Sequence, residues 1–206
     1  FRSPKFWLIA AVASSSQGSF LAIQTLWSGP WLRDVAGLDP EAVAHVLLIS
    51  ACGFIAGNIA IGLFAVWVGR RGVPTPVVLM FGMALFMLVQ LAIVLGWTDQ
   101  TGILWFLFGF TGTTGILAFA VLTRVFPITL AGRASTAMNL LLFVAAFAMQ
   151  WSIGIVIDMW PVTDAGGYHP QGYQVSFAAV LVVQVITFGV LLFGHRALVP
   201  DGSEAR

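Results

Sequence analysis

The sequence predicts an all-α membrane protein with six transmembrane helices. Only 8% of its 206 residues are charged, whereas 59% are hydrophobic. A soluble domain usually carries about 25% charged residues, which cover its surface. Six windows of the chain contain no Asp, Glu, Lys or Arg, and each exceeds the about 20 residues that a helix needs to cross a bilayer. Helices are expected because hydrocarbon cannot satisfy open backbone groups, and because the windows lack the alternation of barrel strands.

The same composition argues against several classes of function. A net charge of +1 provides no basic surface for nucleic acid. The single cysteine, Cys52, can form neither an internal disulfide nor a Cys-rich metal site. No catalytic motif or carboxylate pair stands out, so we expect no enzyme, no metal and no cofactor. The windows also lack the buried ionisable group that proton relays use.

The charge-free windows place the helices at about 6–28, 42–67, 76–96, 103–124, 135–157 and 174–194. Local signals mark several of their ends. Asp39, Pro40 and Glu41 form a cap, a first-turn proline and an acid at the start of the second helix. Thr75-Pro76 opens the third helix in a similar way. Most tryptophans lie near predicted helix ends, as interfacial anchors do.

The basic residues predict the orientation. With six spans, eight of the nine fall on one side of the membrane: Arg2, Lys5, Arg70, Arg71, Arg124, Arg133, Arg196 and Arg206. The opposite side receives only Arg33. Because basic residues accumulate on the cytoplasmic side, both termini are expected in the cytoplasm.

The first helix carries an organised polar face. At 100° per residue, six residues fall within an arc of about 120°: Ser14, Gln17, Gly18, Gln24, Thr25 and Ser28. A glutamine in lipid leaves hydrogen-bonding atoms unpaired, so this arc must face protein or water. Hydrogen bonding to a neighbouring helix and the wall of a solute pathway are both open interpretations.

Two further helices add candidates for the same pathway. On the fifth helix, Asn139 and Gln150 lie three turns apart on one face. The fourth helix contributes Thr111 and Thr114, although threonines in membrane helices often bond their own backbone.

The other helices show simpler patterns. Gly53 and Gly57 give the second helix a small-residue seam in GxxxG spacing, which indicates close helix packing. The third helix is nearly featureless apart from Gln90 and is expected to face lipid.

The loop between the second and third helices carries a family resemblance. Residues 62–72 read GLFAVWVGRRG, which resembles the major facilitator superfamily loop G-x-L-A-D-R-x-G-R-R. The matching residues are Gly62, Ala65, Gly69, Arg70 and Arg71. Phe64, Val66 and Trp67 replace the leucine, the acid and the first arginine, as is expected more of the family's second half. The segment around Arg133 is similar to the family's cytoplasmic segment before its eleventh helix.

The resemblance implies that the chain supplies helices seven to twelve of a twelve-helix transporter in a bacterial inner (cytoplasmic) membrane. It implies two three-helix inverted repeats, at about 6–96 and 103–194. The first and fourth helices would line a central cavity, the second and fifth would contact the other half, and the third and sixth would lie outside. Without an acid at Val66, the family's cytoplasmic latch cannot form. Arg70 and Arg71 then dock on helix C-termini or lipid phosphates, or serve only as topology determinants.

The leading hypothesis is a secondary transporter that moves a small solute by alternating access. Its partners would be the lipid bilayer, the solute and an N-terminal six-helix half, from the same longer chain or from a second copy. Because the chain opens with Phe1, we expect it to be a piece of a longer protein. The alternative is a six-helix membrane sensor or assembly subunit that transports nothing. A membrane-embedded enzyme ranks last.

Overall fold

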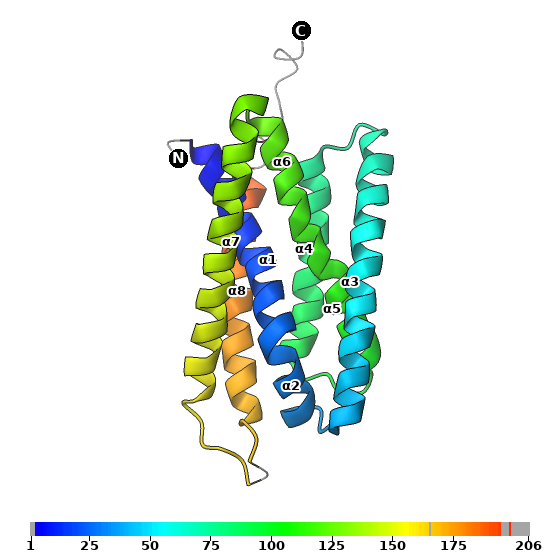
Figure 1. Cartoon of the computed structure of the whole chain (residues 1–206), viewed down its shortest axis with the longest axis vertical. Coiled ribbons are helices and arrows are strands. Elements are labelled where there is room, and N and C mark those ends of the chain that lie inside the picture. Colours follow the sequence, from blue (N-terminus) through cyan, green and yellow to red (C-terminus); the bar gives the residue numbers. More distant parts are fainter. Residues whose placement is uncertain (1–2, 165, 195–197, 199–206) are drawn as a thin grey trace.

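The computed structural model confirms six helices that are long and apolar enough to cross a membrane. The structure describes residues 3–164, 166–194 and 198, and this part of the chain is helical without strands. The helices run side by side, with the N-terminus and the α3–α4 turn at the same end of the bundle (Figure 1). The six spans are Pro4–Asp34, Pro40–Gly69, Thr75–Val94, Thr101–Val125, Ile128–Ile157 and Pro170–Gly194.

The first span is longer than expected and has an irregular centre. It consists of α1 (Pro4–Ala22), the π-helical segment η1 (Ile23–Trp27) and α2 (Ser28–Asp34). The sequence prediction ended this helix near residue 28, before Pro30. Proline has no N–H, and in a regular helix its ring would meet the carbonyl of Leu26. The widened π-helical turn just before Pro30 accommodates the ring, so the helix continues to Asp34.

The second, third and sixth spans start close to prolines. In α3 (Pro40–Gly69), Pro40 occupies the first turn, and the Asp39 carboxylate accepts a hydrogen bond from the Ala42 N–H at 2.9 Å, as the sequence predicted. The third span, α4 (Thr75–Val94), begins with Thr75 as a helical residue rather than as a capping one. The sixth, α8, runs over Pro170–Gly194 and so begins before residue 174.

The fourth and fifth spans differ from the expected bounds for separate reasons. The fourth comprises α5 (Thr101–Gly112), the 3-10 segment η2 (Thr113–Ile116) and α6 (Leu117–Val125). The fifth, α7 (Ile128–Ile157), begins directly after Pro127 rather than near residue 135. The charge-free window had excluded Arg133, but a helix can project beyond the hydrocarbon and carry a charge there.

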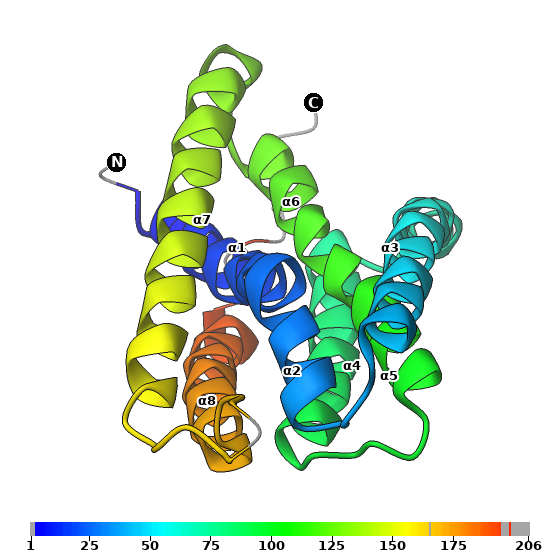
Figure 2. The ribbon, with the colours of Figure 1, turned by 60° about the horizontal axis from the view of Figure 1, so that its bottom comes forward.

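The spans differ sharply in burial within the chain. The most apolar windows of the first and fourth spans are 67% and 61% buried, whereas those of the second and fifth are each 22% buried. Helix α3 packs mainly on α5, and α1 packs mainly on α7. Figure 2 shows α1 and α2 enclosed between α7 and α8 on one side and α3 to α6 on the other. The first and fourth spans therefore form the interior, and α3 and α7 form outer faces.

Helix α4 does not turn its polar residue to lipid, in contrast to the expectation for the third helix. Gln90 is fully buried, and its Oε1 accepts a hydrogen bond of 2.6 Å from Nε2 of Gln184 on α8. An amide facing hydrocarbon would lose its hydrogen bonds to water without replacement. The two amides therefore hold α4 and α8 together across the bundle.

The glycine seam of α3 allows close packing on α5, as its spacing predicted. A Cβ added at Gly53 would collide with the carbonyl oxygen of Phe106, and one added at Gly57 would collide with that of Phe110. Gly109 on α5 lies equally close to the carbonyl of Ser50. Because backbone meets backbone here, neither helix can yield to a larger side chain.

Gly57→Leu is therefore expected to destabilise the protein by about 1–3 kcal/mol or more, because the added side chain forces α3 and α5 apart. The measurement is the thermal midpoint of helix loss in detergent, followed by circular dichroism. Gly62→Leu is the matched control, because a Cβ at this position of the same helix meets no atom within 4 Å. Equal midpoints for the two variants would contradict the packing of the seam.

Candidate functional site

The first span exposes one narrow face, and that face is mostly polar. Six of the residues between positions 10 and 25 are not buried, and the rest are. These six are adjacent or three to four positions apart, so they lie on one side of the helix. We call this face the polar stripe; it consists of Ala11, Ser14, Gln17, Leu21, Gln24 and Thr25. Four of the six carry a hydroxyl or an amide. A helix that offered its only free face to lipid would place apolar residues there, so the polar stripe faces water or another protein.

A polar layer crosses the bundle at the level of Gln17. It separates two apolar clusters, of which one ends at Ala13 on the first span and the other begins at Phe20. Within the layer, the hydroxyls of Ser15 and Thr187 lie 2.7 Å apart and join α1 to α8. A polar layer thus lies between two apolar parts of the bundle, which is unusual for a protein packed in hydrocarbon.

Two buried oxygen atoms in this layer have no protein partner. They are Oγ of Ser16 and Oε1 of Gln17. Both point to Gly115 in η2: the position of a Cβ on Gly115 would lie 2.7 Å from Gln17 Oε1 and 3.3 Å from Ser16 Oγ. Glycine in the 3-10 segment therefore lets the two oxygens lie close to its backbone, where a larger residue would collide with Gln17.

One end of the polar stripe is bonded to both outer helices. Gln24 Oε1 accepts a hydrogen bond of 2.9 Å from Ser50 Oγ on α3. Thr25 Oγ1 accepts one of 2.8 Å from Gln150 Nε2 on α7, and it donates to the carbonyl of Leu21. Both bonds start from η1, so the π-helical segment lies where three spans meet through polar groups. Such segments often occur at functional sites.

A pocket of about 340 Å³ lies beside these bonds. Its polar groups are the amide of Gln150 and the carboxylate of Asp158, and its aromatic walls come from Trp27, Phe147 and Trp151. The indole of Trp27 donates to the Gln150 carbonyl at 3.1 Å, which fixes that ring. No sequence pattern indicates that Trp27 and Asp158 share a pocket, because tryptophans and acids near helix ends usually mark the interface.

Three of the predicted pathway residues lie elsewhere. Thr111 and Thr114 are buried, and their hydroxyls donate to the carbonyls of Leu107 at 2.7 Å and of Thr111 at 2.8 Å. This self-bonding favours a packing role for them. Asn139 is exposed on α7, about 16 Å along the helix from Gln150. The structure thus gathers Gln24, Thr25 and Gln150, with Gln17 two turns away.

The residues of the loop motif surround the α3–α4 turn. Arg70 and Arg71 are exposed, and Gly72 completes the turn with φ +83°, a conformation that favours glycine. The Arg71 guanidinium lies 3.6 Å from the ring centroid of Trp67, in cation–π contact. Gly62 and Gly69 face open space, and Arg133 is exposed on α7. Trp67, where the family motif has arginine, thus provides a contact for Arg71.

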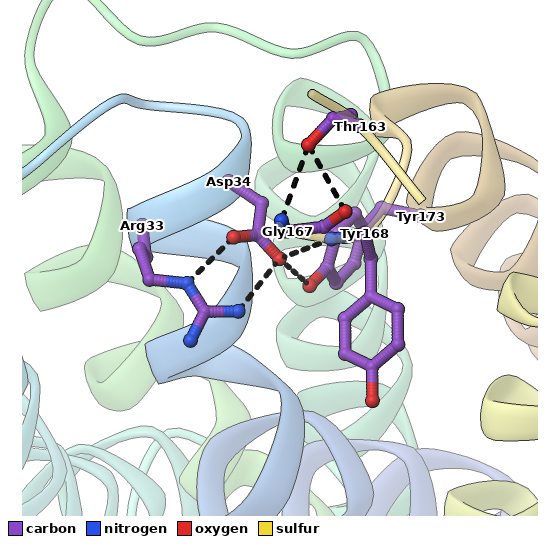
Figure 3. Close-up of polar contacts among 6 residues, drawn as sticks. All are labelled: Arg33, Asp34, Thr163, Gly167, Tyr168 and Tyr173. Atoms are coloured by element: carbon purple, nitrogen blue, oxygen red, sulfur yellow. Dashed lines mark hydrogen bonds and ion pairs between the residues drawn. The ribbon is translucent and has the colours of Figure 1, made fainter. Parts of the chain in front are cut away.

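At the opposite end of the bundle, a buried carboxylate joins the first span to the sixth (Figure 3). The Asp34 side chain is only 3% exposed, and Arg33 Nε donates to its Oδ1 at 2.6 Å. Its Oδ2 accepts from the Tyr173 hydroxyl at 2.7 Å and from the Tyr168 N–H at 3.1 Å. We call this group the Asp34 clasp. It connects the end of α2 to α8 and to the loop before it.

The Asp34 clasp also supports the wall of the pocket. The ring of Trp27 lies edge-on to Tyr168 and Tyr173, with centroids 6.1 and 6.3 Å away. No local pattern pairs Asp34 with Tyr173, which lies 139 residues further along the chain.

Tyr173→Phe is expected to lower the stability by about 1.5–3 kcal/mol, because it removes a buried hydrogen bond to a charged carboxylate. Thermal unfolding in detergent measures the change. Tyr168→Phe provides the control, since Tyr168 bonds Asp34 through its backbone and should be nearly neutral. A Tyr173→Phe protein as stable as Tyr168→Phe would show that the clasp contributes nothing.

Comparison with known proteins does not identify the function of this site. No protein-family model matches the chain, and no match was found among curated proteins. The family resemblance therefore continues to depend on the residues of the loop motif. The function has to be argued from the polar stripe and the surfaces around it.

Proposed function

We propose that this chain is the six-helix C-terminal half of a secondary transporter of the major facilitator superfamily. It moves a small polar solute across the cytoplasmic membrane by alternating access. The observation that carries the proposal is the polar stripe: the most buried span leaves one face free, and four of its six residues are polar. A solute that crosses hydrocarbon needs such a face, because it loses its water there.

The outer helices support the presence of a second half. Helices α3 and α7 are the least buried spans, and both present large apolar side chains outward. On α7 these include Phe143, Phe147 and Trp151, which lie on the same outer side as Gln150. A second six-helix unit that covers α3 and α7 would enclose the polar stripe between the halves. It comes from the same longer chain or from a second copy.

The helix contacts support an inverted repeat. The pairs α3–α5 and α1–α7 exchange when the first three spans are exchanged with the last three. Gln90 and Gln184, which bond each other, each lie about four turns after the start of α4 and α8. This symmetry is what a two-fold axis in the membrane plane predicts.

The chemistry of the stripe indicates the class of solute. Gln17, Gln24 and Thr25 on the stripe, and Gln150 beside it, offer amide and hydroxyl groups. None of these groups is charged, so they suit a polar, uncharged solute bound by hydrogen bonds. Alternating access then exposes the stripe to one side of the membrane at a time.

The distribution of charge supports the orientation. Among the described basic residues, Lys5, Arg70, Arg71, Arg124 and Arg133 lie near the ends of α1, α3, α6 and α7 that share one end of the bundle, whereas Arg33 ends α2 at the opposite end (Figure 1). We infer that the N-terminus and the C-terminus are cytoplasmic.

A six-helix sensor or assembly subunit is the second candidate, and one observation favours it. Gln24 and Gln150 already form bonds between helices, with Ser50 and Thr25. In that case the polar stripe is a dry contact with another subunit, and it never meets water or solute. Solvent access to Gln17 separates the two functions.

A cysteine at Gln17 should react with a small hydrophilic thiol reagent in the full-length protein, because a transport pathway fills with water. The exposed Cys52 is first replaced by alanine. Val12→Cys and Ile23→Cys are the controls, since both residues are buried on the other sides of the same helix and should react far less. An unreactive thiol at position 17 would favour the subunit contact.

Gln17→Leu should weaken the apparent affinity for the solute about two- to twelvefold, the effect of one lost hydrogen bond. Uptake by proteoliposomes with the full-length protein, tested against a panel of polar solutes, measures it. The variant should keep its thermal midpoint. Gln184→Leu is the contrasting variant, because it leaves buried Gln90 unpaired and should lower the midpoint. Loss of stability in Gln17→Leu, with no solute transported by the unaltered protein, would reject the proposal.

A further inference from the structure

An apolar groove of about 230 Å³ lies between α3 and α4. Both helices pack on α5 more than on each other, so the space between them stays open above α5. Small residues widen it and aromatic rings border it: Gly57, Ala60 and Phe64 on α3, Phe81 and Gly82 on α4, and Phe110 on α5. We call this the α3–α4 groove.

The α3–α4 groove offers no hydrogen bond. Its only hydroxyl-bearing residues are Thr111 and Thr114, and both hydroxyls donate to backbone carbonyls of their own helix. The threonines therefore present their methyl groups. A polar solute gains nothing here, whereas a hydrocarbon chain fits the surface.

One end of this groove carries two cations. Arg70 and Arg71 lie in the turn that connects α3 to α4. Phe64, in the groove, has its ring centroid 6.1 Å from that of Trp67, and Trp67 holds the Arg71 guanidinium at 3.6 Å. The contacts of Phe64 with Trp67 and of Trp67 with Arg71 therefore connect the apolar groove to the exposed guanidinium of Arg71. Among the described residues, neither arginine has an acidic partner.

The length of this arrangement matches one leaflet of a bilayer. Gly57 and Arg70 are separated by about 20 Å along α3. The hydrocarbon of one leaflet is about 15 Å thick, half of the bilayer core. With Trp67 at the level of the interface, Arg70 and Arg71 reach the headgroups while the groove reaches the ends of the chains.

We propose that the α3–α4 groove and its two arginines form a binding site for an anionic phospholipid. The phosphate lies on Arg70 and Arg71, and one acyl chain lies in the groove between Phe64 and Gly57. A headgroup with net negative charge is preferred because both cations are otherwise unpaired. The site is independent of the transport function, since it uses neither the polar stripe nor the pocket beside Gln150.

Lipid titration by native mass spectrometry of the full-length protein in detergent tests the site. The probes are phosphatidylglycerol and phosphatidylcholine with identical acyl chains. The anionic lipid should bind more tightly, by about fivefold for each arginine. Arg70→Gln with Arg71→Gln should abolish this preference. Arg70→Gln or Arg71→Gln alone should reduce it, whereas Arg133→Gln, which removes the same single charge on α7 away from the groove, should keep it.

A second pair of variants tests the acyl chain. Ala60→Leu fills the groove and should weaken both lipids, whereas Ala51→Leu, on the same helix outside the groove, should weaken neither. Equal binding of the two lipids would overturn the site, as would an equal effect of Arg133→Gln. Displacement of phosphatidylglycerol by an equal concentration of inorganic phosphate would also overturn the site, because the acyl chain would then contribute nothing to binding.

Discussion

Hydrocarbon offers no hydrogen-bonding partner, and this constraint determines where each polar side chain of the six spans lies. Gln90 is buried against Gln184, Ser15 meets Thr187, and Thr111 and Thr114 bond their own backbone. Five buried side-chain atoms of the described residues still have no protein partner: Ser16 Oγ, Gln17 Oε1, Gln90 Nε2, Gln184 Oε1 and Trp105 Nε1. Of these, Ser16 Oγ and Gln17 Oε1 lie together beside Gly115, on and next to the polar stripe.

Irregular backbone occurs in both of the interior spans. The first contains the π-helical segment η1 and the fourth contains the 3-10 segment η2. The former presents Gln24 and Thr25 to two different helices, and the latter places Gly115 beside two free oxygens. Regular helices would offer a smoother packing surface, whereas these two segments bring polar groups of neighbouring spans together.

The pocket beside Gln150 and the α3–α4 groove suit opposite ligands. The pocket beside Gln150 combines aromatic walls with an amide and a carboxylate, and it adjoins the polar stripe. The α3–α4 groove is lined by apolar atoms and ends at two unpaired arginines. Because the two linings share no residue, a lipid and a solute can be bound at once.

The sequence by itself determined the number of helices, their approximate bounds, the Asp39 cap and the glycine seam of α3. Each depends on hydropathy or on residues within four positions of one another, which a linear pattern records. Tertiary structure alone decided that Gln90 is buried, that Asp34 bonds Tyr173, and that the first helix passes Pro30. The first two depend on partners 94 and 139 residues away. The third depends on a π-helical turn, which becomes favourable only when Gln24, Thr25 and Trp27 find their partners on α3 and α7.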